Sequence, residues 1–181
     1  MGILCFAFTG GNGMLSSNLL RTVPTSTSAT AAARSHIVKL AENEIGVRER
    51  TNQNDGPRVE EYLRCVGLKK GQPWCAAFVS YIFQKGGFAK PRSGWSLALF
   101  PAGRLARSAL AGNLIGIYFP EYKRIAHVGI IVKQEGDWII SVEGNTSLSG
   151  SRDGEGVFRK KRQVKTIYNM SDWITGKGRV L

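Results

Sequence analysis

Few residues of this chain could serve as a cysteine nucleophile and its histidine base, because the 181 residues include only three cysteines and two histidines. Cys75 follows Pro73 and Trp74 and opens a strongly apolar segment, so we expect it at the N-terminus of a buried helix. Free backbone N–H groups and the helix dipole at such a position lower the pKa of a thiol and can bind an oxyanion. We therefore expect Cys75 to be a nucleophile, although packing alone would also explain a buried cysteine.

A nucleophilic cysteine needs a base, and the two candidates are His36 and His127. His36 is expected in the first turn of an amphipathic helix, exposed to solvent and without a special role. His127 opens the apolar strand His127–Lys133, at a strand end where a sheet meets loops and where catalytic groups are often displayed. The positions of the two histidines thus favour His127 as the base.

The turn after this strand decides what lies beside His127. The loop Gln134-Glu135-Gly136 predicts a three-residue hairpin, with Gly136 where the turn needs a glycine. In that register His127 lies opposite Glu143, and Asn145 lies two residues further along the same sheet face. A carboxylate or amide beside an imidazole fixes its tautomer and orientation, as in a catalytic triad. A two- or four-residue loop would instead put His127 and Glu143 on opposite faces.

The chain is strongly basic, with 25 Lys and Arg residues against 13 Asp and Glu, a formal net charge of +12 and a pI of about 10.0. This excess predicts a polyanionic neighbour: nucleic acid, an anionic membrane surface or an anionic cell-wall polymer. Its densest stretch, Arg159–Arg162 followed by Lys165, is expected to be a solvated basic strand edge. The odd number of cysteines excludes a complete disulfide framework, and their spacing does not fit a zinc site.

The first 34 residues differ from the rest, since they contain no acidic residue and include the Ser-, Thr- and Ala-rich stretch Thr22–Ala33. We expect a flexible lead or linker over residues 1–34 and one soluble globular domain over residues 35–181. The lead is a poor secretory signal, because no positive charge precedes its short apolar run Ile3–Phe8. The small residues Ala29–Ala33 do fit a cleavage site, so export with processing stays open.

The hydrophobic pattern is helical in the first half of the domain and extended in the second. The expected helices are Ser35–Gly46, Val59–Val66, a central apolar one at Trp74–Phe83, and a short one at Arg104–Ala111. The expected strands are Leu114–Phe119, His127–Lys133, Trp138–Val142 and Gly156–Arg162. Helices first and strands later in one domain predict an α+β fold with an antiparallel sheet.

Three short segments, in this order along the chain, resemble the CHAP domain (cysteine, histidine-dependent amidohydrolase/peptidase) of the NlpC/P60 papain-like superfamily. They are Pro73–Ser80, His127–Val132 and Val142–Thr146. The lead-in Ala41–Gly67 is similar to that of bacterial and phage members. The resemblance covers about residues 36–175, and the order of Cys, His and acid at these spacings is its specific part.

The resemblance implies a papain-like fold, in which the helix that begins at the cysteine packs on a C-terminal antiparallel sheet. It also implies a peptidoglycan hydrolase that cuts either the amide between muramic acid and L-Ala or a peptide bond of the stem or crossbridge. Carried over by position, Cys75 is the nucleophile and His127 the base, while Glu143 orients the base and Asn145 is a supporting polar group. Water would then hydrolyse a thioester intermediate.

Trp74, Trp95 and Tyr118 are candidate walls of a substrate groove, although aromatic residues are more often part of a core. Glu143 and Asn145 have ordinary alternatives as well, a solvated strand end and a turn residue. Some relatives bind calcium in the loop before the cysteine helix. The acids and amides of Glu49–Asp55 do not reproduce the ligand spacing of an EF-hand, so we expect no metal and no other cofactor.

The expected enzyme is a monomer without a transmembrane segment that acts in the bacterial cell wall, the periplasm or the extracellular space. Its positive charge would hold it on anionic wall polymers, and nucleic acid is not the expected partner. Two alternatives from other classes use the same residues. One is a non-catalytic basic module that binds walls or nucleic acid on a papain-like frame, and the other is a cysteine amidase toxin that acts on protein side chains.

Overall fold

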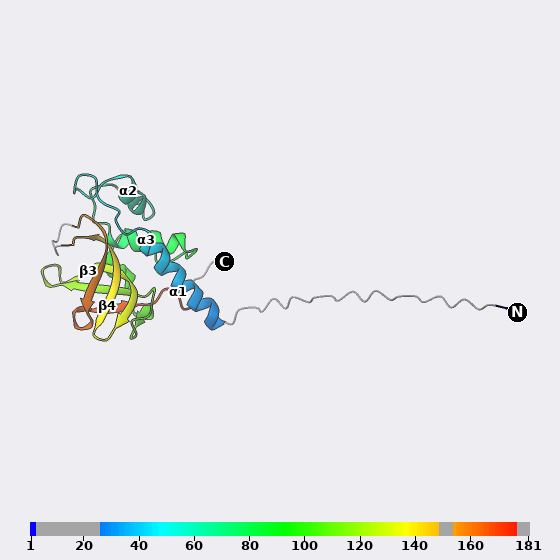
Figure 1. Cartoon of the computed structure of the whole chain (residues 1–181). Coiled ribbons are helices and arrows are strands. Elements are labelled where there is room, and N and C mark those ends of the chain that lie inside the picture. The colour runs from blue at the N-terminus through cyan, green and yellow to red at the C-terminus, as the bar shows by residue number, and fades with distance from the viewer. Residues whose placement is uncertain (3–25, 149–153, 177–181) are drawn as a thin grey trace.

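The computed structural model describes residues 1–2, 26–148 and 154–176. Its helices and strands form an α+β fold (Figure 1). The helices are α1 (Ser26–Glu42), α2 (Pro57–Arg64) and α3 (Cys75–Lys85). The strands are β1 (Leu105–Ala106), β2 (Leu114–Phe119), β3 (Arg124–Glu135), β4 (Trp138–Thr146), β5 (Gly156–Gln163) and β6 (Asn169–Ser171). They form one antiparallel sheet in the order β1-β6-β2-β3-β4-β5. The coarse expectation of helices packed with an antiparallel sheet is confirmed.

Helix α3 is the buried centre of the helical layer. It begins at Cys75 and its C-cap is Gly86, as the sequence predicted. Every residue from Cys75 to Phe83 is buried, because α1 and α2 cover the helix on one side and β3 and β4 on the other. The three helices gather on one side of the sheet (Figure 1). None of the described helices is both long enough and apolar enough to span a bilayer.

Helix α1 begins at Ser26, inside the segment that was expected to be a linker, and ends at Glu42. The predicted boundary between residues 34 and 35 is therefore wrong. Alanine has the highest helix propensity, and the Ala-rich stretch places Ala33 on one buried stripe with Ile37 and Ala41. The rest of the expected lead, including its apolar run, lies outside the described residues apart from residues 1–2.

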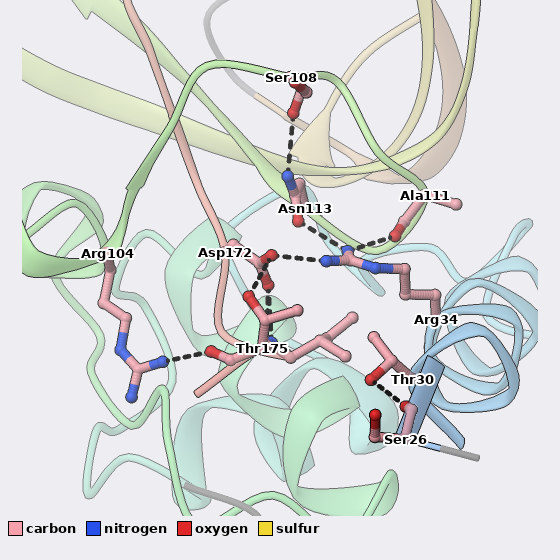
Figure 2. Close-up of polar contacts among 10 residues, drawn as sticks. Ser26, Thr30, Arg34, Arg104, Ser108, Ala111, Asn113, Asp172 and Thr175 are labelled. Atoms are coloured by element: carbon pink, nitrogen blue, oxygen red, sulfur yellow. Dashed lines mark hydrogen bonds and ion pairs between the residues drawn. The ribbon is translucent and has the colours of Figure 1, made fainter. Parts of the chain in front are cut away.

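Arg34 ties α1 to two distant parts of the chain (Figure 2). Its guanidinium donates to Oδ2 of Asp172 at 2.5 Å, to Oδ1 of Asn113 at 2.8 Å and to the carbonyl oxygen of Ala111 at 2.9 Å. The side chains of Arg34 and Asp172 are only 11% and 16% exposed. The helix is thus fixed to the segment after β6 and to the loop before β2.

The segment Arg104–Ala111 does not form the short helix that was expected. A 3₁₀ turn over Ala102–Arg104 leads instead into the two-residue strand β1, which pairs with β6. Neither β1 nor β6 was predicted. Both are too short to show a repeating pattern, and their pairing joins segments that lie far apart in the sequence.

The two faces of the sheet carry different cores. Ile130 and Val142 belong to the main core with the helices, whereas Ile115, Ile131 and Ile139 form a smaller core on the other face. Side chains alternate between the faces along each strand. Ile131 of β3 therefore points to the smaller core, whereas its neighbour Ile130 points to the helical layer.

Candidate active site

Cys75 is the first residue of α3, and the residue is 5% exposed. Its Sγ lies 3.3 Å from Oγ of Ser96 and 3.9 Å from the carbonyl oxygen of Ala126, and it shares a hydrogen bond with the imidazole of His127. Burial alone would raise the pKa of Cys75. The hydrogen bond and charge of His127, with the hydroxyl of Ser96, outweigh that effect, so the pKa of the thiol is lowered overall.

His127 stands between the thiol and a carboxylate. Its Nε2 lies 2.8 Å from Oε2 of Glu143, which leaves the other ring nitrogen for Cys75. The ring is buried, and burial lowers the pKa of a histidine. The hydrogen bonds to Cys75 and Glu143 reverse this effect and raise the pKa of His127 to about 9. Both shifts favour a thiolate beside an imidazolium.

Glu143 is completely buried and has three polar neighbours. Its Oε1 accepts from Oγ of Ser141 at 2.6 Å and from Nε of Arg162 at 2.6 Å, and its Oε2 accepts from Nη2 of Arg162 at 2.5 Å and also contacts His127. Burial would raise the pKa of Glu143, but the hydrogen bonds from Arg162 and His127 hold it well below its usual range. The carboxylate is thus ionised at neutral pH.

The hairpin that aligns His127 with Glu143 differs from the predicted one. Glu135 pairs with Trp138, so the turn has two residues, and Gly136 takes a φ of 56° that favours glycine. A two-residue turn alone would place His127 and Glu143 on opposite faces.

A β-bulge restores the shared face. Ile131 pairs with Ser141 but Lys133 pairs with Ile140, so Val132 is one extra residue in β3. The expected face is thus observed, although the expected loop and register are wrong.

Glu143 lies opposite Gly129 rather than opposite His127, because Ile130 pairs with Val142. Its side chain crosses over Gly129 to reach the imidazole. A Cβ atom at position 129 would lie 2.5 Å from Cγ of Glu143. The diagonal contact between His127 and Glu143 therefore requires the absence of a side chain at residue 129.

A second bulge lies on the other side of His127. Ile117 of β2 pairs with His127 and Tyr118 pairs with Ile125, which makes Ala126 an extra residue in β3. The carbonyl oxygen of Ala126 lies 3.4 Å from Oγ of Ser96 and 3.9 Å from Sγ of Cys75. Bulges redirect side chains and backbone groups next to active sites, and this one brings the strand to the thiol.

The structure does not join Asn145 to the other candidate residues. Asn145 is half-buried with a left-handed backbone, φ 53°, next to the irregularity where the pairing of β4 with β5 shifts. Within the described residues its amide makes no hydrogen bond to Cys75, His127 or Glu143. Its supporting role stays a prediction.

The three candidate aromatic residues have different surroundings. Trp74 is completely buried and its indole N–H donates to Oε1 of Glu49 at 2.8 Å, so it cannot line an open groove and that expectation is wrong. Trp95 is 53% exposed and precedes Ser96 in the chain. Tyr118 is half-buried and stacks on Tyr168 with a centroid distance of 4.8 Å. Substrate binding by Trp95 and Tyr118 stays a prediction.

The basic run of β5 was expected to be a solvated strand edge, but its residues have different surroundings. Arg159 forms an exposed ion pair with Glu42 and Lys161 covers the ring of Trp138. Arg162 turns inward to Glu143. Sequence reasoning missed Arg162, Ser141 and Ser96 as members of the site. Buried carboxylates are usually paired with a cation. That rule indicates the basic run of β5 as the source of a partner for Glu143, but it does not indicate which residue of the run.

The loop Glu49–Asp55 uses its carboxylates internally. Glu49 also accepts the backbone N–H of Asn54 at 2.8 Å, and Asp55 accepts the backbone N–H and the hydroxyl of Thr51, both at 2.9 Å. Within the described ranges no group of three or more His, Cys, Asp or Glu side chains is placed to hold a metal ion.

Comparisons with known proteins add a distant structural likeness. No family model matches the chain, and no curated protein matches it. A solved structure described as "The crystal structure of Ly7917" is similar with a TM-score of 0.44 and 12% sequence identity. The match covers 76% of this chain and 61% of that one, so this chain spans less than two thirds of its length. We draw nothing about fold or function from a likeness at that level.

Proposed function

We propose that this protein is a cysteine hydrolase that cleaves an amide bond of bacterial peptidoglycan through a thioester intermediate. The observation that carries the proposal is the continuous chain of buried contacts from Cys75 through His127 to Glu143. These contacts favour a reactive thiolate and an oriented imidazolium, which an amide hydrolase of this type needs. The choice of peptidoglycan, and of a papain-like frame, rests on the resemblance of three segments to the CHAP domain.

In the proposed first step the thiolate of Cys75 attacks the carbonyl carbon of the amide, a carbon–sulfur bond forms and the carbonyl electron pair moves to oxygen. Backbone N–H groups at the start of α3 hold the oxyanion, among them that of Ala76, which already bonds to the thiol. The tetrahedral intermediate collapses, the carbon–nitrogen bond breaks, and the imidazolium of His127 gives its proton to the leaving amine.

The second step returns the enzyme to its starting state. Neutral His127 takes a proton from water, and the resulting hydroxide adds to the thioester carbon. The carbon–sulfur bond then breaks, which releases a carboxylic acid and restores the thiolate beside the imidazolium. Glu143 stays ionised throughout and holds the ring in place.

Digestion of purified peptidoglycan tests this proposal. Mass spectrometry should find new free amines on L-Ala if the enzyme is an amidase, or new termini within the peptide if it is an endopeptidase. Cys75→Ala should release neither. The absence of new termini with the wild-type protein would contradict the proposal.

A basic module that only binds walls or nucleic acid would not need a reactive thiol. Labelling of Cys75 with iodoacetamide as a function of pH separates the two classes, because only the thiolate reacts. We expect a labelling midpoint below the ordinary thiol value of about 8.5. A midpoint at that value, with unchanged function in Cys75→Ala, would favour the binding module.

We further propose that the net charge of +12 concentrates a monomeric enzyme on anionic wall polymers, in the cell wall, the periplasm or outside the cell. Salt screens such an attraction. Binding of the Cys75→Ala variant to purified sacculi should therefore weaken as ionic strength rises, and salt-independent binding would rule the electrostatic mechanism out.

A further inference from the structure

Arg162 lies on β5 and binds the carboxylate of Glu143 through two nitrogen atoms, Nε and Nη2. Two parallel N–H to oxygen bonds fix both the position and the plane of a carboxylate. Ser141 adds a third hydrogen bond at Oε1. The arrangement leaves Glu143 in one orientation, with Oε2 facing the Nε2 of His127.

The charges of the site balance only when Arg162 is counted. Cys75 and Glu143 supply two negative charges in the active protonation state, and His127 and Arg162 supply two positive ones. Cys75, His127 and Glu143 are all less than 9% exposed, and the side chain of Arg162 is 25% exposed. Without the guanidinium, a buried cluster would carry one uncompensated negative charge, which favours uptake of a proton.

No other cation replaces Arg162 within the described part of the chain. Lys160 lies on the same face of β5, but its ammonium donates to the carbonyl oxygen of Ser147 at 2.6 Å. The neighbouring strand β2 places the apolar Ile117 beside His127. The 3₁₀ turn Ser96–Leu99 brings the neutral hydroxyl of Ser96 to the thiol and adds no charge there.

We propose that Arg162 is a positioning residue of this site, which balances and orients Glu143 so that the thiolate–imidazolium pair exists at neutral pH. The role of Arg162 in catalysis rests on the proposed hydrolase function. Arg162 acts through Glu143 and His127 and touches no reacting atom. A purely structural salt bridge would stabilise the fold equally well but would leave the titration of Cys75 unchanged.

Labelling of Cys75 against pH, followed on its own peptide by mass spectrometry, tests this role without any substrate. In Arg162→Met the site should hold an extra proton, so the labelling rate at pH 7 should fall about tenfold, the factor that one unit of pKa produces. Arg162→Lys keeps the positive charge but cannot form the bidentate pair of hydrogen bonds with Glu143. It should label nearly as fast as wild type, while kcat falls because Glu143 is less well oriented.

The matched control is Arg159→Met, which removes an arginine from the same strand. Arg159 pairs with Glu42 at the surface, and its side chain is 49% exposed. We expect its labelling profile to equal that of wild type.

A second pair of variants keeps the proposal testable if Arg162→Met does not fold, because a lone buried carboxylate is costly. Glu143→Gln combined with Arg162→Met removes both charges and leaves none unpaired. Compared with Glu143→Gln alone, the double variant lacks a nearby positive charge, so its labelling midpoint should lie at a higher pH.

The outcomes separate this inference from the proposed function. Equal labelling profiles for wild type and Arg162→Met, or for Glu143→Gln and the double variant, would reduce Arg162 to a structural residue. Failure of the wild-type protein to cleave peptidoglycan would contradict the proposed function, and the labelling profiles would still decide the role of Arg162.

Discussion

Glu143 reaches His127 diagonally across Gly129, with 2.8 Å between its Oε2 and the Nε2 of the imidazole. The contact depends on three features of the sheet. The Val132 bulge brings both residues to one face, Gly129 leaves room for the crossing side chain, and Arg162 of β5 holds that side chain in place.

Gly129→Ala should displace Glu143 from His127. The new Cβ would lie 2.5 Å from Cγ of Glu143, which is completely buried and cannot swing away. Inserting a methyl group into a packed interior costs about 1–3 kcal/mol. We expect hydrolysis to fall by about a hundredfold, the loss that a misplacement of about 1 Å produces.

The control for this variant is Gly103→Ala, where a Cβ would meet no atom within 4 Å. Peptidoglycan hydrolysis rates and melting temperatures of the two variants should be compared with wild type. A Gly129→Ala enzyme as active as Gly103→Ala would show that the diagonal contact does not matter for the reaction.

The rate of hydrolysis should depend on pH as a bell-shaped curve. The imidazolium of His127 protonates the leaving amine, and its raised pKa of about 9 means that activity is lost as the pH rises through that value. On the acid side activity is lost as the thiolate of Cys75 takes up a proton. Because the pKa of this thiol is lowered, the acid limb should lie below the ordinary thiol value.

A series of kcat/KM measurements from pH 5 to about pH 10.5 on a soluble peptidoglycan fragment would check this profile. An activity that rises continuously through pH 9 would contradict the raised pKa of His127. It would instead indicate a neutral thiol and imidazole at pH 7.

Ser96→Ala should weaken the thiolate without touching His127 or Glu143. The hydroxyl of Ser96 lies 3.3 Å from Sγ and helps to lower the pKa of Cys75. A hydrogen bond to a charged group contributes about 1.5–3 kcal/mol, so labelling at pH 6 should slow by about tenfold or more. Ser35→Ala, at an exposed serine of α1, is the matched control. Equal labelling of both variants would remove Ser96 from the site.

Arg34→Met should loosen α1 from the rest of the domain. The change leaves Asp172, 16% exposed, without its cation and removes the bonds to Asn113 and Ala111. Breaking a largely buried ion pair costs about 3 kcal/mol or more. Urea unfolding should show this loss, whereas Arg107→Met, at an exposed position, should leave the stability unchanged. Equal stability of the two variants would mean that the contacts of Arg34 do not contribute to the free energy of unfolding.

Local patterns were enough to predict much of the architecture. The apolar run after Pro73 located α3 and placed Cys75 at its first residue, and strand β2 was predicted at its observed bounds. Such features follow from the side-chain periods of helices and strands and from glycine at their ends. The scarcity of cysteine and histidine then singled out Cys75 and His127, which the structure brings together.

The start of α1 and the burial of Trp74 were not predictable in the same way. A Ser-, Thr- and Ala-rich stretch is helical only if something anchors it, and here the anchor Asp172 lies 138 positions from Arg34. Trp74 could have faced a groove or a core, and the buried partner Glu49 decides for the core. Both outcomes depend on partners that are distant in the sequence.

By itself, therefore, the sequence determined the central helix α3, the strands β2 to β5 and which residue types could react. The tertiary structure decided their alignment. One extra residue at Val132 changes the face of every side chain before it in β3, and no hydrophobic pattern specifies such a bulge. The choice of Arg162 as the partner of Glu143 likewise depends on the pairing of β4 with β5, which only the packed sheet defines.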